Sequence, residues 1–469
     1  MRIHSLLAGL LLTAASIASA QAETIRVAIG TQDTTINTAT GGLIIREEKL
    51  LEKYLPRDGK YKDVTYDIQW KNFTSGAPIT NEQIAGKLDF GVMAEFPGVL
   101  NGVAHEKAGR KSLFITALQG SVKGSGNGIV VPTASPVQSF SELKGKTISV
   151  PFASTAHAFL LRAVAAQGWD PEKDVTIITQ APEVAGPALQ ANKIDAHADF
   201  VPFAELFPWR GFARKILDGS QAEGPTFHGA LVDAAYAEKY PEIVVAYLRA
   251  AIEADRLVAA EPEKYSELIA MVTGVEAEVN YLFHGPLGLQ TRDLTWKPEF
   301  RQDVATALET LKLLKKTDQG LDLNTFISET YIKQAFKEAG LDYEAQLKNY
   351  AQSPLNAKDA LTGEEIKDAK RVAQIWINGE PLVHHYATAA NAFKALKAFE
   401  ADGKTVRVFY AQDRESGIKL LGAKSWFVRT DSGDVSAFLL KENAEAWAKS
   451  NGGKVLDYNG ARAAVLASN

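Results

Sequence analysis

Two hydroxyl residues and one imidazole stand where they could bind an anion. Ser154, Thr155 and His157 come just after a predicted strand that ends at Val150, and an apolar-periodic helix follows them. Ser154 or Thr155 therefore stands at a helix N-cap, where its hydroxyl could accept a hydrogen bond from the helix's own free amides. Alternatively, the amides, the helix dipole and the hydroxyls could together bind an oxyanion of a ligand. The residues alone leave both interpretations open.

Three other predicted strand ends carry short polar or glycine-containing loops. These loops are Gly30-Thr31-Gln32, Thr74-Ser75-Gly76 and Ala94-Glu95. In parallel α/β sheets, ligands bind beyond the carboxyl ends of the strands. Micromolar binding requires about 8 kcal/mol, whereas one charge-assisted hydrogen bond contributes about 1.5 to 3 kcal/mol. We therefore expect several loops to converge on one ligand, in a cleft between two lobes.

Motifs of enzymes are missing from the sequence. It contains no G-x-S-x-G and no G-x-G-x-x-G, and Phe140 stands where a phosphate loop ending in Gly145-Lys146-Thr147 would need glycine. His105-Glu106 begins like a zinc-protease helix, but Gly109 replaces the second histidine ligand. We therefore expect a protein that is not an enzyme and has no catalytic residues and no cofactor.

Composition and charge exclude further classes of function. The 469 residues are 46% hydrophobic and 23% charged, which is typical of a globular protein of about three domains. The formal charge of -5 and the lack of a basic block argue against nucleic acid as a partner. There is no cysteine, so disulfides, thiolate metal sites and cysteine nucleophiles are excluded.

The first 22 residues have the pattern of a secretory signal. Arg2 precedes a short apolar run at residues 6–12, and A-x-A sites end at Ala20 and Ala22. No later stretch approaches 18 consecutive apolar residues. We expect the mature chain to be periplasmic and not inserted in the membrane.

The elements that position the polar loops alternate between strand and helix. Strands are predicted at residues 24–30, 64–70, 89–93, 114–118, 128–131, 147–150 and 175–178, with helices that include 43–54, 82–85 and 156–167. This alternation predicts an α/β fold with parallel sheets. Long amphipathic helices follow, such as 243–259 and 302–315. A turn-rich stretch at 351–365 reads as a linker, and an α+β unit is predicted at 366–469.

Several sequence runs resemble the periplasmic binding proteins of nitrate, sulfonate and taurine ABC importers. They are S-V-P-F-A-S-T-A-H-A-F-L-L (149–161), G-W-D-P-E-K-D-V-T-I-I (168–178), A-L-Q-A-N-K-I-D-A (188–196) and T-S-G-A-P-I-T-N-E-Q-I-A-G-K-L-D-F-G (74–91). The resemblance implies a two-lobed type II binding protein over residues 23–350, with one lobe at about 24–118 and 225–350 and the other at about 119–224. It also implies a small solute, a cognate permease and an ATPase as partners, and closure by hinge motion.

The resemblance also implies which residues contact the solute. The matching positions are Gly30, Thr31, Gln32, Ser75, Gly76, Glu95, Ser154, Thr155, His157, Asp199 and His228, and Phe152, Phe200 and Phe203 could stack on the solute. If Glu95 and Asp199 face the cleft, they would pair with an ammonium group, which favours taurine or another amino-sulfonate. Nitrate is less favoured because Gly-Glu-Pro-Trp is missing where 198–203 stand. Bicarbonate or a pyrimidine-type solute are further alternatives.

The last hundred residues resemble NosL, a copper-chaperone domain. The resemblance rests on A-K-S-W-F-V-R (423–429) and the run from Val435 to Tyr458, but the family's Cys and Met copper ligands are missing. His384 and His385 are nearby candidates for metal ligands, although neighbouring residues point to different sides of a strand. A metal-handling accessory protein is therefore an alternative function, and a hydrolase ranks last. We expect no metal site.

Overall fold

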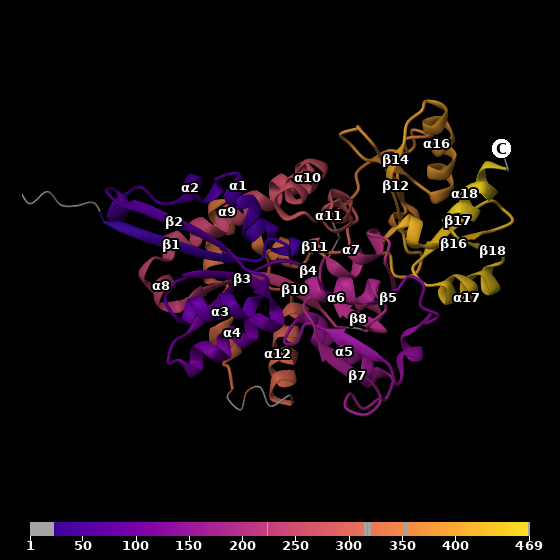
Figure 1. Ribbon diagram of the computed structural model, residues 1–469. Coiled ribbons are helices and arrows are strands. Elements are labelled where there is room, and N and C mark those ends of the chain that lie inside the picture. The colour runs from indigo at the N-terminus through magenta and orange to yellow at the C-terminus, as the bar shows by residue number, and fades with distance from the viewer. Residues whose placement is uncertain (1–22, 223, 314–316, 318–319, 351–353, 468–469) are drawn as a thin grey trace, which may run out of the picture.

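The computed structural model describes residues 23–222, 224–313, 317, 320–350 and 354–467 (Figure 1). The predicted secretory signal lies outside these residues. Two sheets with their helices make up most of the chain, and a third body at the C-terminal end packs beside them (Figure 1). None of the described helices is both long enough and apolar enough to cross a membrane.

The first sheet has six strands in the order β11-β4-β10-β3-β1-β2. Its strands are β1 (Thr24–Thr31), β2 (Thr65–Asn72), β3 (Phe90–Ala94), β4 (Ser112–Ser121), β10 (Thr226–Asp233) and β11 (Thr291–Arg292). β1 runs parallel to β2 and β3, whereas β10 runs antiparallel to β3 and β4. The sheet therefore mixes βαβ units with one strand that returns from the second sheet.

The second sheet repeats this arrangement with five strands in the order β7-β6-β8-β5-β9. Its strands are β5 (Gly128–Pro132), β6 (Thr147–Val150), β7 (Thr176–Thr179), β8 (Ala196–Asp199) and β9 (Ala213–Asp218). β6 is parallel to β7 and β8, and β5 is antiparallel to β8 and β9. Ile148, Ser149 and Val150 of β6 are all buried, as expected for a parallel strand covered on both faces.

Helices cover both sheets. The N-terminal helices are α1 (Leu43–Glu47), α2 (Leu50–Tyr54), α3 (Gly76–Ile84), α4 (Glu95–Lys107), α5 (Thr155–Ala166), α6 (Pro182–Gln190) and α7 (Phe203–Trp209). Those that follow β10 are α8 (Ala234–Lys239), α9 (Pro241–Ala260), α10 (Pro262–Thr273), α11 (Ala277–His284), α12 (Pro298–Leu313), α13 (Leu323–Phe326), α14 (Thr330–Glu338) and α15 (Tyr343–Leu347). α12 packs on α4, and α9 packs on α2 and α14, so both return to the first sheet.

The chain crosses between the two sheets twice, and glycines let the crossings touch. The first crossing joins β4 to β5 and the second joins β9 to β10. A Cβ on Gly124 would lie 2.2 Å from the carbonyl oxygen of Gly224, and one on Gly219 would lie 2.0 Å from that of Gly124. Gly124 also has φ of 90°, which L-residues rarely adopt. Backbone therefore packs directly on backbone where the two sheets join.

The C-terminal unit contains two antiparallel sheets. One has the order β13-β12-β14-β15 and the other β17-β16-β18. Its elements are β12 (Ala373–Ile377), β13 (His384–Tyr386), α16 (Ala389–Ala401), β14 (Val406–Gln412), β15 (Lys419–Leu421), β16 (Trp426–Arg429), β17 (Val435–Phe438), α17 (Lys441–Asn451), β18 (Lys454–Leu456) and α18 (Tyr458–Leu466).

This unit is fixed to α10 and α11 and shares their core. Trp376 and Tyr410 are buried against Tyr281 of α11, with ring centroids 5.5 and 5.6 Å away. The Tyr410 hydroxyl donates a hydrogen bond to the Glu278 carbonyl at 2.7 Å. Part of the predicted linker also packs on the unit, because the buried Asp359 carboxylate accepts hydrogen bonds from three backbone N–H groups and the Asn391 amide.

Candidate functional site

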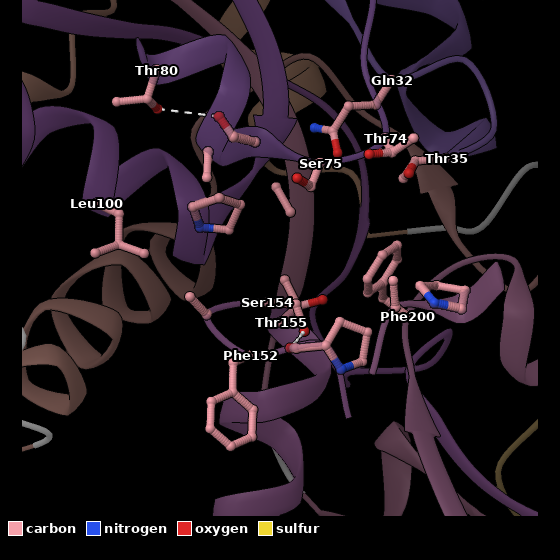
Figure 2. A pocket seen from close by; sticks show the side chains of 18 of the residues that line it. Gln32, Thr35, Thr74, Ser75, Thr80, Leu100, Phe152, Ser154, Thr155 and Phe200 are labelled. Atoms are coloured by element: carbon pink, nitrogen blue, oxygen red, sulfur yellow. Dashed lines mark hydrogen bonds between the residues drawn. The ribbon is translucent and has the colours of Figure 1, made fainter. Parts of the chain in front are cut away.

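A cavity of about 430 Å³ lies between the two sheets. Residues after β1, β2 and β3 line it from the first sheet, and residues after β6, β7 and β8 line it from the second. The cavity therefore lies beyond the carboxyl ends of the parallel strands, where α/β folds bind ligands. Figure 2 shows Gln32, Thr74 and Ser75 on one side of the space, opposite Ser154 and Thr155 on the other.

Four helices begin at this cavity. The residues that line it include Ser75 and Gly76 of α3, Ala94 of α4, and residues at the starts of α5 and α6. The first amides of a helix have no intrahelical partner, and the dipole leaves partial positive charge there. Several such ends around one space favour a negatively charged group.

Ser154 combines the two roles that the sequence left open. Its hydroxyl accepts a hydrogen bond from the His157 N–H at 3.3 Å and donates one to the Pro151 carbonyl at 2.6 Å. Ser154 is therefore the N-cap of α5, and it also lines the cavity. Thr155 is buried and donates to the Asn127 amide oxygen at 3.0 Å, which joins α5 to the first crossing.

Ser75 differs from Ser154 because its hydroxyl does not cap its own helix. Ser75 is the N-cap residue of α3 but makes no side-chain cap hydrogen bond. The hydroxyls of Ser75, Thr74 and Thr35 have no hydrogen-bond partner within the described residues, and all three residues line the cavity. Their donors are available to a ligand, which makes this side of the cavity the better supplied with free donors.

The cavity has little formal charge. Among its described lining residues there is no lysine or arginine, and Glu183, an exposed residue in the first turn of α6, is the one carboxylate. His228 is buried, and burial lowers its pKa to about 3, so its imidazole is neutral at physiological pH. An anion would therefore be bound by dipoles and hydroxyls, with one carboxylate nearby.

Apolar side chains line the rest of the cavity. Leu100 and Ala104 of α4 face it together with Pro97, and Phe200 lines it from the end of β8 (Figure 2). The Phe152 ring is 49% exposed and stacks on the His157 ring at 4.6 Å between centroids. A ligand with an organic portion would therefore have apolar surface to contact.

Eight of the thirteen residues predicted to bind the solute line the cavity. These are Gln32, Ser75, Gly76, Phe152, Ser154, Thr155, Phe200 and His228. Gly30, Thr31, Glu95, His157 and Asp199 do not. Phe203, predicted to stack on the solute, is not among the lining residues either, and its ring instead packs edge-on against Phe200.

The expectation that Glu95 and Asp199 face the cleft and pair with an ammonium group must be corrected. Both are buried, 4% and 0% exposed, and neither lines the cavity. Glu95 accepts a hydrogen bond from the Phe227 N–H, and Asp199 pairs with the His197 imidazole at 2.7 Å. Their strand-end positions were predicted, but these partners direct the carboxylates into the protein.

The other three residues support the site from behind. A Cβ on Gly30 would lie 2.7 Å from the Leu88 side chain, so the residue allows close packing under the loop. Thr31 donates a hydrogen bond to the Asp33 carboxylate at 2.8 Å. The His157 imidazole accepts a hydrogen bond from the Ala153 N–H at 3.3 Å and so holds the turn before α5.

Sequence reasoning missed several lining residues. They include Thr35, Thr80, Asn81, Leu100, Thr179 and Glu183, while Thr74 was identified only as part of a loop. Two of these could have been found, because Thr179 ends β7 and Glu183 follows it, as Ser154 follows β6. Thr35 could not, because it lies outside every predicted strand and helix.

The described residues contain no group of three or more His, Asp or Glu side chains that could hold a metal ion. In the C-terminal unit, His384 bonds to Glu380 at 2.5 Å, whereas His385 bonds to the Gln374 amide at 3.1 Å. The two imidazoles thus bind different partners.

Comparison with known proteins gives consistent matches. The model of the NMT1-like family matches residues 20–273. A taurine-binding periplasmic protein of Escherichia coli is 31% identical over 244 residues, which are 49% of this chain and 72% of that protein. The matched family segment contains every predicted site residue but excludes the C-terminal unit.

Solved structures confirm the predicted fold class. The periplasmic aliphatic sulphonate binding protein SsuA of Escherichia coli superposes with a TM-score of 0.53 at 24% identity, covering 66% of this chain and 98% of its own. The periplasmic nitrate-binding protein NrtA of Synechocystis PCC 6803 gives 0.52 at 15% identity, covering 71% and 92%. At these identities the likeness concerns the fold alone, and the fold is that of a periplasmic binding protein.

Proposed function

Because the chain belongs to the NMT1-like family, we propose that it is the periplasmic solute-binding component of an ABC importer and that it binds a sulfonate between its two sheets. One observation carries the proposal. Four helix N-termini and three unpartnered hydroxyls surround a cavity whose described lining has no cationic side chain. A sulfonate offers three acceptor oxygens and one dispersed negative charge, which suits this set of donors.

The size and the wall of the cavity favour an organic sulfonate over a small inorganic anion. A volume of about 430 Å³ leaves room beyond a single anionic group, and Leu100 and Ala104 offer that room an apolar wall. Nitrate or bicarbonate would leave this wall uncovered. The relative named for taurine supports the same class of solute.

Glu183 supports an amino group on the solute. It is the one carboxylate lining the described part of the cavity, and it makes no ion pair with any residue that the structure describes. A carboxylate here would repel a simple anion but attract an ammonium group on the same molecule. Glu183 thus takes the role that the sequence had assigned to Glu95 and Asp199, and an amino-sulfonate such as taurine remains the proposed solute.

Binding would close the two sheets over the solute about the glycine-rich crossings, and the closed form would dock on a permease that works with an ATPase. The cavity takes contacts from both sheets, so a bound solute favours the closed state. This accounts for the two-sheet architecture without any catalytic step.

Calorimetric titration tests the proposal. Taurine and ethanesulfonate share a two-carbon sulfonate, but only taurine has an amino group. We expect wild-type protein to bind both and to prefer taurine, and Glu183→Gln to lose about tenfold in taurine affinity while retaining ethanesulfonate. Glu172→Gln, an exposed residue outside the cavity, is the matched control. Binding of nitrate without any sulfonate would contradict the proposed class, whereas equal taurine binding by wild type and Glu183→Gln would contradict only the role of Glu183.

A further inference from the structure

A second cavity, of about 490 Å³, lies where the C-terminal unit meets the crossings. Lys123 of the first crossing and Ser220 of the second line it, together with β11 and the loop after α11. From the C-terminal unit, Lys367, Lys370 and Gln412 line it. No lining residue is common to this second cavity and the cavity between the two sheets, which we call the interlobe cavity.

The charged residues that line this second cavity are all lysines. Four lysines line it, namely Lys123, Lys297, Lys367 and Lys370, and its described lining contains no carboxylate. Lys297 is neutralised by Asp293 at 2.6 Å, and Lys370 donates to the Glu415 carbonyl at 2.9 Å. Lys123 and Lys367 make no ion pair with any described residue. Two ammonium groups from different parts of the fold are thus available to an anion.

Gln412 gives an independent indication of a ligand. Gln412 is 3% exposed as a whole residue, and it lines the cavity. The amide nitrogen donates to the Leu287 carbonyl at 3.4 Å, but the amide oxygen is buried and has no hydrogen-bond partner within the described chain. Buried polar atoms are rarely left without a partner, since this costs about 1 to 3 kcal/mol. A donor on a bound molecule would satisfy it.

Apolar side chains also line the second cavity, beside the lysines and Gln412. Val122, Leu289, Leu355 and Ile418 line the cavity. We propose that this second cavity binds an amphipathic organic anion, with the anionic group at Lys123 and Lys367 and the apolar body against these side chains. The ligand would contact both crossings and the C-terminal unit, which gives that unit a binding role of its own.

The probe 8-anilinonaphthalene-1-sulfonate has an anionic group, apolar rings and an N–H donor, and its fluorescence rises in apolar surroundings. We expect the full-length protein to bind it with defined stoichiometry, and the double variant Lys123→Ala and Lys367→Ala to bind about fivefold or more weakly. Lys397→Ala, an exposed lysine of α16 outside both cavities, should bind like wild type. Octanoate should displace the probe, whereas octylamine should not.

The sulfonate of the probe could also enter the interlobe cavity, so Ser75→Ala separates the two sites. The proposal expects the lysine-dependent part of the probe signal, which the double lysine variant loses, to remain in Ser75→Ala. It is overturned if the double lysine variant binds like wild type, if Ser75→Ala loses this lysine-dependent part, or if octylamine displaces the probe as well as octanoate does. Gln412→Leu gives a second reading of the same site, with weaker probe binding expected. The lysine-dependent signal is assigned to the second cavity whether or not the cavity between the two sheets binds sulfonates.

Discussion

The Glu95 carboxylate accepts a hydrogen bond from the backbone N–H of Phe227 at 3.1 Å, so α4 is tied to β10 by a buried acid. Burial raises the pKa of Glu95 to about 7, although this hydrogen bond opposes the rise. Asp303 of α12 and Arg162 of α5 are the charged groups that act on it. The pKa of Asp303 is also raised by burial and by Glu95. The acid pair lies behind the cavity wall and is not part of it.

This buried acid predicts a pH-dependent stability. In the folded state Glu95 keeps its proton up to a pH of about 7, whereas in the unfolded chain, with a pKa near 4.5, it releases the proton at lower pH. Wild-type protein therefore loses stability as the pH rises from about 4.5 to about 7. We expect Glu95→Gln to gain about 1 kcal/mol or more over wild type between pH 5 and pH 8, measured by urea unfolding. Glu172→Gln should show no such gain, and a constant difference between Glu95→Gln and wild type would refute the prediction.

The buried Lys419 should make stability depend on pH with the opposite sign. Its amine is buried 4.5 Å from the Tyr281 ring centroid, without a hydrogen-bond partner among the described residues, and burial lowers its pKa well below the usual range. Because the unfolded chain binds this proton up to about pH 10.5, wild-type stability should rise with pH below that value. Lys419→Met should be more stable by about 1 kcal/mol or more at pH 7, and the gap should narrow by pH 10. Lys397→Met serves as the control in the same denaturation series.

A substitution at Gly124 tests whether stability requires the close backbone contact between the two crossings. Alanine there would meet both a positive φ and the Gly224 carbonyl oxygen, 2.2 Å from its Cβ. Gly274 has φ of 73° but open space around it, so Gly274→Ala isolates the backbone contribution of about 1 kcal/mol. We expect Gly124→Ala to lower the melting temperature clearly more than Gly274→Ala. Equal effects would show that the crossings can separate without loss.

Local patterns were enough to predict seven of the eleven strands described in the two larger sheets, because their signals lie within the strands themselves. β6 was predicted at its observed bounds, Thr147–Val150, and α5 within one residue. The helix expected at 43–54 is instead two helices, because Lys49 adopts φ of 51° and breaks the hydrogen-bond pattern. Such a break depends on packing, and no glycine or proline marks it in the sequence.

The orientation of side chains was harder to predict than their position. Residues 31–42 lie outside every predicted strand and helix, but Ile36–Gly41 is a buried 3₁₀ helix whose Asn37 amide donates to Gln290. That partner is more than 250 residues away in the chain, so no local pattern could indicate it. Glu95 shows the same limit. Its place at a strand end was clear, but only the return of β10 shows why its carboxylate points inward.

Ser75 and Ser154 predict an asymmetric effect of removing a hydroxyl. Both line the cavity, but Ser154 caps α5 whereas the Ser75 hydroxyl has no partner among the described residues. Ser75→Ala should therefore weaken sulfonate binding about tenfold with an unchanged melting temperature, because a hydrogen bond to a charged group contributes about 1.5 to 3 kcal/mol. Ser154→Ala should weaken binding and also lower stability by about 1 kcal/mol, the usual contribution of an N-cap. Titration calorimetry and thermal unfolding separate the two, with Ser450→Ala on the exposed face of α17 as the control. A Ser75→Ala variant that binds sulfonate like wild type would place the anion at another helix end.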